Sequence, residues 1–287
     1  MPIRSLLFIP ANKENMLVKA ASCEPDVLVP DLEDSIPDGE KDMARKTIAD
    51  WLPRLAAHNA RLMPRINSIQ TEWFELDVAA VVAPGVCGIS IGKVNSAADI
   101  STICNVLTRA EQEAGLETGR LHLIPLIESA LAIVHCHEIC MASDRIAAVA
   151  FGGEDYTTDM GIERLDDESN LLYARSTICN AAQAAGVLAL DTPYFQFRND
   201  EGLRASSLAA KRLGFNGRFA IHPAQIETIN TCFLPTDAEI EQAQRIIAAF
   251  EAAERQGSGS TSLDGRVIDV PVVKRARALV AEAVSTD

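Results

Sequence analysis

The feature of this sequence that most constrains its fold is a series of short apolar runs separated by longer stretches with helical patterning. Eight runs have the composition of buried strands: Leu6–Ile9, Asp26–Val29, Leu62–Ile66, Val86–Ile91, Leu121–Ile127, Ile146–Phe151, Val187–Leu190 and Phe219–Ile221. Buried strands that alternate with helical segments of about 10 to 20 residues are typical of a parallel sheet in an α/β protein. A count of eight favours the closed (β/α)8 form over an open doubly wound sheet. We therefore predict a TIM barrel.

Most of these runs end in an ionisable residue. Six of them do so, at the following positions: Asp31 with Glu33 and Asp34, Arg65, Lys93, Glu128, Asp155 and Asp191. The last run leads into His222. The carboxyl ends of the strands in a parallel barrel meet on one face, and that face holds the active site in enzymes of this fold. The sequence therefore predicts an enzyme whose catalytic groups stand at strand ends.

Two of the strand-end residues, Glu128 and Asp155, are carboxylates that each follow a strongly apolar run. Strand-end acids can simply cap the next helix. Two carboxylates completed by water and substrate oxygens also suit Mg²⁺, which seldom uses a cage made only of protein ligands. We predict that Glu128 and Asp155 bind Mg²⁺, and that the neighbouring Glu154 and Asp159 are solvated or structural.

Arg65, in the segment Pro64–Asn67, has two possible roles. It could form an ordinary salt bridge with the acidic cluster Asp31–Asp34. A guanidinium keeps its charge and offers several donors in one plane, so it also suits a substrate carboxylate or a developing enolate oxygen. Its place at a barrel strand end favours catalysis or substrate binding over a purely structural role.

Other polar positions are less specific. The segment His135–Cys140 contains two histidines and two cysteines, but His135 and His137 are two residues apart and face different sides of a helix. This spacing favours a buried helix face over a zinc site. Asp191 and His222 fit equally well as capping residues or as site residues, so both roles stay open at this point.

The end of the chain differs in composition from the rest. A helical stretch from Asp237 to Gln256 is followed by Gly257–Ser262, a low-complexity segment rich in Gly and Ser, and by a last helical segment at about 272–284. Such Gly and Ser composition is typical of a flexible linker. We expect residues 1–256 to form the barrel and residues 257–287 to form a linker and a C-terminal lid or tail.

Composition and charge exclude several classes of protein. A net charge of −14 argues against nucleic acid or an anionic membrane as the main partner, because such partners are held by excess Lys and Arg. The apolar run that stops at Pro10 is too short for a signal-peptide core or a membrane span. The seven cysteines lack a C-x-x-C spacing and fit a reducing compartment. We expect a cytoplasmic protein.

Several segments, taken in their order along the chain, resemble the citrate lyase β-subunit-like branch of the HpcH/HpaI aldolase family, which also includes malyl-CoA and citramalyl-CoA lyases. The segments are Arg4–Pro10, Asp31–Asp34, Glu40–Lys41, Ala44–Arg45, Arg65–Asn67, Pro125–Glu128, Phe151–Tyr156, Arg198–Gly202, Gly214–Gly217, Ala220–Gln225 and Val267–Pro271. Each is weak alone, but their shared order is specific and spans nearly the whole chain. Two positions depart from the family pattern. Gly92 stands where relatives have a proline before Lys93, and an extra proline, Pro30, is expected to bend the chain before Asp31.

The resemblance implies a (β/α)8 barrel, an oligomer built from trimers (a trimer or a hexamer), and Mg²⁺ held by Glu128 and Asp155. It places Arg65 at the reacting carbonyl, and we expect Arg65, Glu128 and Asp34 to contact the substrate. It also implies that Asp269 reaches an active site, commonly that of the adjacent subunit, and acts there as a general acid or base.

The implied reaction is the reversible carbon–carbon cleavage of a 3-hydroxyacyl-CoA thioester of the malyl-CoA or citramalyl-CoA type. Its products, and hence the protein's partners, would be an acyl-CoA thioester and a small 2-oxo acid. Three alternatives stay open. The chain could be the β subunit of a citrate lyase acting on citryl-acyl carrier protein, a malyl-CoA thioesterase, or a non-catalytic barrel that serves as an assembly subunit.

Overall fold

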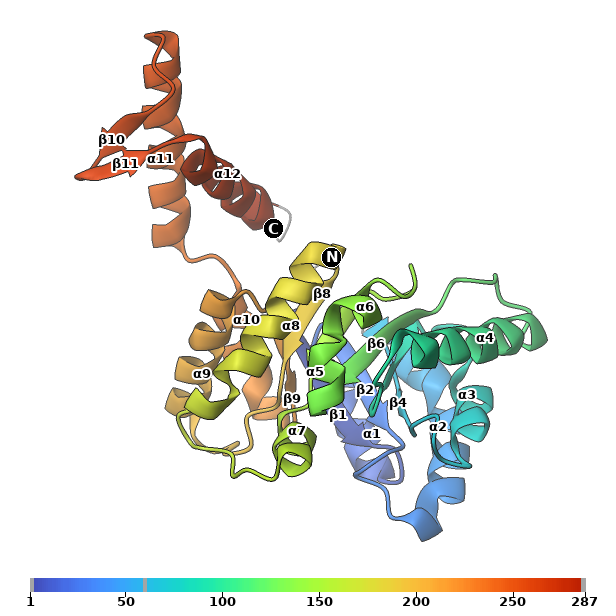
Figure 1. The fold of residues 1–287 in the computed structure, drawn as a ribbon. Coiled ribbons are helices and arrows are strands. Elements are labelled where there is room, and N and C mark those ends of the chain that lie inside the picture. Colours follow the sequence, from blue (N-terminus) through green and yellow to red (C-terminus); the bar gives the residue numbers. More distant parts are fainter. Residues whose placement is uncertain (1–2, 59–60, 285–287) are drawn as a thin grey trace. The chain divides into compact units, whose positions relative to one another are not determined.

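The computed structural model describes residues 3–58 and 61–284 of the chain, coloured along the sequence in Figure 1. The chain forms two compact units, Ile3–Asn230 and the part from Thr231 onward, which we call the barrel unit and the C-terminal unit. This division lies earlier than the expected boundary after Gln256. The reason is that helix α11 (Asp237–Arg255) packs against α12 (Val270–Val284) within the C-terminal unit.

The strands are short, as in most barrels. They are β1 (Ser5–Pro10), β2 (Val27–Asp31), β3 (Arg61–Leu62), β4 (Arg65–Ile66), β5 (Gly88–Ile91), β6 (His122–Ile127), β7 (Ala148–Phe151), β8 (Leu188–Asp191), β9 (Gly217–Ala220), β10 (Thr261–Leu263) and β11 (Arg266–Ile268). The other α-helices are α1 (Glu14–Ala20), α2 (Lys41–Ala56), α3 (Phe74–Val81), α4 (Ala97–Glu113), α5 (Ala130–Val134), α6 (Cys136–Cys140), α7 (Gly153–Met160), α8 (Leu172–Ala185), α9 (Asp200–Leu213) and α10 (Ile226–Phe233). Three short 3₁₀ helices are η1 (Asp38–Glu40), η2 (Ser169–Leu171) and η3 (Pro223–Gln225).

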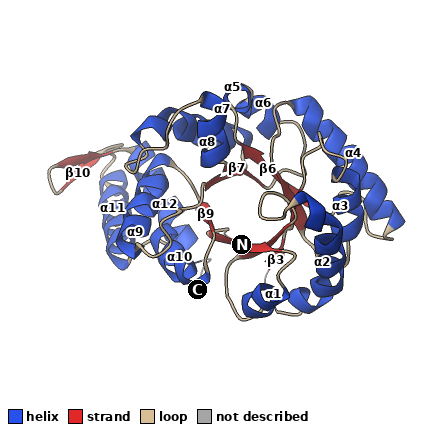
Figure 2. Ribbon diagram, turned by 90° about the horizontal axis from the view of Figure 1, so that it is seen from below, coloured by secondary structure: helices blue, strands red, loops and turns tan. Residues whose placement is uncertain are grey.

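The strands of the barrel unit close into a ring. Each pairs in parallel with the next along the chain, β3 and β4 share one place beside β2, and β1 pairs with both β2 and β9. Figure 2 shows the ring of strands with helices around it. All eight predicted strands are present, and the predicted (β/α)8 barrel is confirmed.

Proline affects two of the strands. The predicted strand Leu62–Ile66 forms as the two pieces β3 and β4, because Pro64 has no amide hydrogen to donate between them. Pro30, which was expected to bend the chain, instead lies within β2 and is paired with Ile9 of β1. The chain therefore leaves the sheet only after Asp31.

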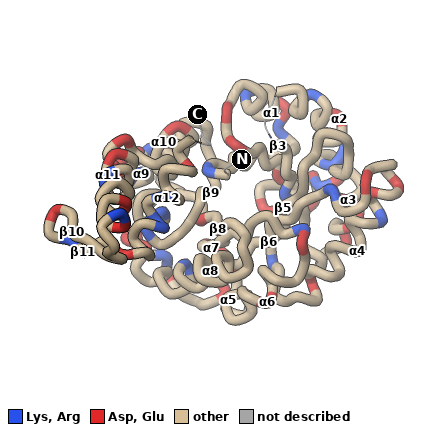
Figure 3. Tube along the Cα trace, turned by 90° about the horizontal axis from the view of Figure 1, so that it is seen from above, with Lys and Arg blue, Asp and Glu red and all other residues tan. Residues whose placement is uncertain are grey.

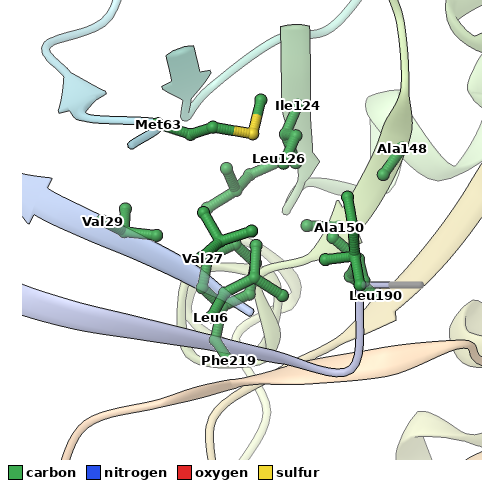
Figure 4. Close-up of a cluster of buried hydrophobic side chains, with 11 residues drawn as sticks. Leu6, Val27, Val29, Met63, Ile124, Leu126, Ala148, Ala150, Leu190 and Phe219 are labelled. Carbon is green, nitrogen blue, oxygen red and sulfur yellow. The ribbon is translucent and has the colours of Figure 1, made fainter. Parts of the chain in front are cut away.

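Every second side chain of a barrel strand points into the barrel. Figure 4 shows this interior, where side chains from different strands meet in one apolar cluster. Its buried members are Ile3, Leu6, Val27, Val29, Met63, Ile124, Leu126, Ala148, Ala150, Leu190 and Phe219. Two residues further along the same strands, the inward positions are ionisable: Asp31 follows Val29, Arg65 follows Met63 and Glu128 follows Leu126. All three ionisable residues are buried. One alternation thus builds both the apolar core and the ionisable groups above it.

The C-terminal unit has a small core of its own, formed by Phe250, Ile268 and Val273. Strands β10 and β11 pair as an antiparallel hairpin between α11 and α12. The predicted linker Gly257–Ser262 therefore runs into an ordered strand at Thr261. No helix within residues 3–58 and 61–284 is long and apolar enough to cross a membrane.

Candidate active site

A cavity of about 460 Å³ opens beyond the carboxyl ends of the barrel strands. Asp34, Arg65, Glu128 and Asp155, which the sequence singled out, all line it. They follow or belong to β2, β4, β6 and β7, which are far apart in the sequence. The barrel therefore brings these four side chains together, as expected from strand-end positions.

The Arg65 guanidinium is buried and contacts three carboxylates. Its Nε and Nη2 atoms donate to the two oxygens of Asp31 at 2.7 and 2.6 Å. Its Nη1 atom lies 3.0 Å from Glu33 Oε2 and donates to Asp34 Oδ2 at 3.1 Å. Burial works against ionisation of Asp31, but the charge of Arg65 and the hydrogen bonds from Arg65, Ser35 and Glu33 together outweigh it and lower the pKa of that carboxyl. An arginine offers five N–H groups, so one, on Nη2, is left for another acceptor.

Lys93 holds the same acidic loop through its side chain. Its Nζ atom lies 3.1 Å from Glu33 Oε1 and 3.5 Å from Asp34 Oδ1. Its backbone φ of 59° is in the left-handed region, which a residue with a Cβ rarely adopts. In this conformation the Lys93 amide donates to Glu128 Oε1. Lys93 thus orients both the acidic loop and the glutamate.

Two glycines enclose the carboxyl group of Glu128. A Cβ on Gly92 would stand 2.6 Å from Glu128 Oε1, and one on Gly152 would stand 2.4 Å from Oε2. Burial, followed by the charges of Glu33 and Asp155, raises the pKa of Glu128 to about 8. A bound cation would reverse this shift, because it favours the charged form of a nearby carboxyl group.

Asp155 lies in the first turn of α7, and burial followed by the charge of Asp34 raises the pKa of its carboxyl group. Glu128 and Asp155 therefore offer hard oxygen donors to one cavity. Within residues 3–58 and 61–284, no group of three or more His, Cys, Asp or Glu side chains could hold a metal ion. Two carboxylates fit Mg²⁺, which usually keeps several waters and takes other ligands from the substrate.

The deeper part of the cavity is apolar. Phe8 and Phe219 are stacked there, with ring centroids 4.6 Å apart and planes at 11°. The central carbon of the Arg65 guanidinium lies 4.6 Å from the Phe8 centroid. Leu126 and Ile221 also line the cavity. Arg65 therefore stands at the border between an acidic region and an apolar wall.

Buried polar residues behind the cavity hold the acidic loop in place. Lys41 Nζ donates to the backbone carbonyls of Leu32 at 2.8 Å and Glu33 at 2.7 Å, and to Asn67 Oδ1 at 2.8 Å. Asn67 in turn donates to Asp77 Oδ2 at 2.6 Å. These bonds fix the backbone on which Glu33 stands.

Known proteins are similar to this chain in sequence and in fold. Residues 4–223 match the HpcH/HpaI aldolase/citrate lyase family. The chain is 39% identical to citrate lyase subunit beta of Leuconostoc mesenteroides subsp. cremoris, over 96% of the chain and 91% of that protein. The chain belongs to the HpcH/HpaI aldolase/citrate lyase family. The family prediction made from the sequence is confirmed.

Two further relatives of this aldolase/citrate lyase chain have different names. It is 33% identical to the L-malyl-CoA/beta-methylmalyl-CoA lyase of Rhodobacter capsulatus, over 98% of the chain and 94% of that enzyme. Its structure resembles that of protein CitE from Mycobacterium tuberculosis in complex with magnesium, acetoacetate and coenzyme A. The TM-score is 0.81 at 28% identity, covering 99% of this chain and 98% of that one.

Asp269, the other catalytic candidate in this family member, lies in the C-terminal unit. It is exposed between β11 and α12, and its Oδ1 accepts a hydrogen bond from the Val272 amide at 3.2 Å. This is the geometry of a helix N-cap. The residues that line the cavity all belong to the barrel unit. A catalytic role for Asp269 therefore stays a prediction.

Asp191, for which two roles were open, belongs to a buried ion network. Its Oδ2 atom lies 2.7 Å from Arg175 Nη2 and 3.2 Å from Arg218 Nη2. Arg218 is fully buried and also donates to the hydroxyls of Ser206 at 3.1 Å and Ser207 at 3.0 Å. Asp191 does not line the cavity. Its contacts are structural.

His222, the second open case, is exposed and caps η3. Its Nδ1 atom accepts a hydrogen bond from the Ala224 amide at 3.2 Å. Its ring stacks on Phe197 with centroids 5.1 Å apart. These contacts match the capping interpretation.

Sequence reasoning missed the residues that position the site. The two glycines, Gly92 and Gly152, come directly after predicted strands, where glycine often marks a close approach. Lys41 and Asn67 stand within the segments shared with the family, but nothing in the local pattern indicated that they contact each other. Nothing in the sequence indicated that the backbone amide of Lys93 donates to Glu128.

Proposed function

We propose that this protein is a Mg²⁺-dependent carbon–carbon lyase that cleaves or forms a 3-hydroxyacyl thioester from an acyl thioester and a 2-oxo acid. The observation that supports this most is the convergence of Arg65, Glu128 and Asp155 on one cavity. Cleavage of this kind needs a stabilised enolate and a polarised carbonyl, which a fixed cation and a divalent metal provide. The relatives are named for the same class of enzyme.

Glu128 and Asp155 are the residues that would hold Mg²⁺. When bound, the ion would act as a Lewis acid toward the oxo-acid half of the substrate. The Lys93 amide engages Oε1 of Glu128, which leaves Oε2 as the freer donor.

The bond that breaks joins the hydroxyl-bearing carbon to the α carbon of the thioester. Its electron pair stays on the thioester as an enolate, while the hydroxyl proton passes to a water molecule and the carbon becomes the carbonyl of the 2-oxo acid. Arg65 stabilises the enolate oxygen with the N–H left on Nη2. Asp34, bound to the same guanidinium and 48% exposed in its side chain, borders this position and contacts the substrate.

Asp269 returns a proton to the enolate carbon in this scheme, so that products form without net proton exchange. We place it in the active site of a neighbouring subunit, with the C-terminal unit as a lid and a trimer or hexamer as the working form. None of the seven cysteines, which all lie in the described part of the chain, forms a disulfide, and this fits the reducing cytoplasm.

Mixed oligomers test the contribution of Asp269. Asp269→Asn protein and Arg65→Ala protein are each expected to be inactive, and their dissociation and reassembly together should restore part of the activity if Asp269 acts in trans. If mass measurements confirm mixed oligomers that are as inactive as either parent, Asp269 acts within its own chain or not at all.

A second candidate is cleavage of a citryl group as a citrate lyase β subunit. It is favoured by the 39% identity to a citrate lyase subunit beta, which exceeds the 33% identity to the malyl-CoA-type lyase. The two candidates differ in the carrier of the acyl group, an acyl carrier protein or coenzyme A.

A substrate panel tests the proposed function. The purified full-length chain with Mg²⁺ is incubated with acetyl-CoA or propionyl-CoA and each of several 2-oxo acids, and products are followed by mass spectrometry. Formation of a 3-hydroxyacyl-CoA supports the lyase. Release of free 3-hydroxy acid and CoA indicates a thioesterase, and turnover only of carrier-protein thioesters indicates the citrate lyase subunit. Binding without any turnover would contradict an enzymatic role.

A further inference from the structure

The start of helix α7 sets the position of Asp155, one of the two residues proposed to hold Mg²⁺. Asp155 is the third residue of this helix, two positions after Gly153. Acidic side chains are frequent in this chain, with 40 Asp and Glu against 26 Lys and Arg, and they are spread along the trace in Figure 3. Negative charge alone therefore does not distinguish a metal site. What distinguishes it is how firmly two carboxylates are held toward one place.

The residue at the N-cap position of α7 is a glycine, Gly152. A Cβ on this residue would stand 2.4 Å from Glu128 Oε2 and 2.5 Å from Glu128 Cβ. The space beside Gly152 is thus filled by Glu128, so the usual capping residues, which carry a side-chain oxygen, do not fit there. The first amide of the helix therefore needs an acceptor from another part of the chain.

Thr192, which follows the neighbouring strand β8, supplies that acceptor. It is buried, and its Oγ1 atom accepts a hydrogen bond from the Gly153 amide at 3.1 Å. A Cβ on Gly153 would stand 3.0 Å from Oγ1 and 3.3 Å from Cγ2 of Thr192, so the threonine side chain also packs against the glycine. The pair of glycines is therefore held between Glu128 on one side and Thr192 on the other.

The backbone of Thr192 is fixed independently of its hydroxyl group. Arg218 donates to the Thr192 carbonyl oxygen from Nε at 3.2 Å and from Nη2 at 3.0 Å. The Thr192 side chain lines the cavity together with Gly153 and Asp155. A change of the hydroxyl group alone therefore leaves the backbone contacts in place and alters only the contact with α7.

Building on the proposed function, we infer that Thr192 is a positioning residue for the metal site. Its hydroxyl group takes the place of an N-cap for α7 and so keeps Asp155 in position relative to Glu128. Replacing a group that orients metal ligands typically weakens metal binding by ~10- to 100-fold. Thr192 acts through Gly153 and the helix backbone, without itself binding the ion.

Magnesium titration of two Thr192 variants tests this inference. Thr192→Val keeps the size of the side chain, but its methyl group cannot accept a hydrogen bond and is too large for a 3.1 Å approach to the Gly153 nitrogen. In calorimetry without substrate, this full-length variant should bind Mg²⁺ ~10-fold more weakly than the native protein. Thr192→Ser keeps the hydroxyl group and should stay within about threefold. Amide hydrogen exchange of the metal-free protein, followed by mass spectrometry, should be faster in the first turn of α7 in Thr192→Val only.

Thr236→Val is the matched control. Thr236 is the N-cap of α11 in the C-terminal unit, where its Oγ1 accepts a hydrogen bond from the Glu239 amide at 3.2 Å. Loss of this cap should destabilise α11 but leave the Mg²⁺ affinity within about twofold, because α11 contributes nothing to the cavity lining. Should Thr192→Val fail to fold, Thr192→Ala removes the same acceptor without adding bulk and gives the same comparison.

The outcomes separate this inference from the function on which it rests. Native Mg²⁺ affinity in Thr192→Val would overturn the positioning role and leave the lyase intact. Native Mg²⁺ affinity combined with weaker binding of pyruvate would overturn it too, because Thr192 would then contact the substrate directly. If the native protein binds no Mg²⁺, the metal-dependent function and this inference are both overturned.

Discussion

Two Arg–carboxylate networks stand near strand ends of the same barrel, and they differ in their balance of charge. The first, which we call the cavity network, consists of Arg65, Lys93, Asp31, Glu33, Asp34 and Glu128. The second, which we call the closed network, consists of Arg164, Arg175, Arg218, Glu154, Glu168 and Asp191. The cavity network has more acids than bases and borders a cavity of about 460 Å³. The closed network has as many acids as bases.

The closed network is satisfied by its own ion pairs and by polar groups packed against it. Arg175 bridges Asp191 and Glu168, and Arg218 fills its donors with Asp191, a backbone carbonyl and two serine hydroxyls. In the cavity network burial raises the pKa values of Glu33 and Glu128; the charges of Glu33 and Asp155 add to the rise at Glu128, whereas the charge of Arg65 opposes the rise at Glu33. A surplus of buried acids is costly without a cation, so it is typical of a binding site. Variants should therefore affect activity in the first network and stability in the second.

The largest expected effect is the loss of Glu128. Glu128→Gln should weaken Mg²⁺ binding and reduce turnover by more than ~10³-fold, because Mg²⁺ prefers charged oxygen ligands and the metal supplies the Lewis acid. Stability without metal should not fall. Burial and the nearby carboxylates raise the pKa of Glu128 and so favour its neutral form, which an uncharged glutamine side chain resembles. Calorimetric titration measures the binding. Glu75→Gln, which is exposed, paired with Arg109 and outside the cavity lining, is the control. Unchanged Mg²⁺ affinity in Glu128→Gln would exclude the metal assignment.

Arg65→Lys should have the next largest effect. Lysine keeps the charge but loses the planar fork, so kcat should fall by ~10²- to 10³-fold while Mg²⁺ affinity stays within about threefold. Steady-state kinetics and metal titration separate the two quantities. Arg109→Lys, at an exposed ion pair with Glu75, should be unchanged. Near-normal turnover would make Arg65 a structural residue.

Arg218→Met tests the closed network. It leaves a fully buried position without its hydrogen bonds and Asp191 with one fewer cation, so the free energy of unfolding should fall by about 3 kcal/mol. Activity per folded molecule should change less than tenfold, since Arg218 does not line the cavity. Denaturant unfolding measures the difference, and the exposed Arg212→Met is the control. A stable but inactive variant would contradict the separation of the two networks.

The cavity network should also make stability depend on pH when metal is absent. The folded-state pKa of Glu128, about 8, lies above the unfolded value of about 4.5, so the folded protein binds more protons between these values. Its contribution to stability is therefore fully present below pH ~4.5 and is lost as pH rises through ~8, by on the order of 5 kcal/mol. Unfolding in EDTA across this range should show a loss that is smaller in Glu128→Gln. If stability falls equally with pH in the native protein and in Glu128→Gln, a group other than Glu128 takes up the proton.

The smallest expected effect concerns the backbone of Lys93. Lys93→Ala and Lys93→Gly both remove the contacts with Glu33 and Asp34, but only glycine relieves the φ of 59°. The glycine variant should be more stable than the alanine variant by about 1 kcal/mol, with similar activity. Thermal unfolding compares them. An alanine variant as stable as the glycine variant would mean that the left-handed backbone costs nothing here.

The sequence alone determined the barrel and the face on which its ionisable groups meet. Both follow from one local rule, the period of two along a buried strand, which places Val29 and Asp31, Met63 and Arg65, and Leu126 and Glu128 on the same side. The segments shared with the family then indicated Asp269, whose role no local pattern reveals.

Only the tertiary structure decided which partners these groups have. Asp191 and Asp31 look alike in sequence, since each ends an apolar run, yet one contacts Arg175 and Arg218 in the closed network and the other contacts Arg65 at the cavity. The cradle of Gly92 and Gly152 around Glu128 and the boundary at Thr231 likewise appeared only in the structure. The physical reason is that alternation sets the direction of a side chain from its own strand, whereas its hydrogen bonds and its pKa depend on residues that neighbouring strands and helices bring within about 3 Å.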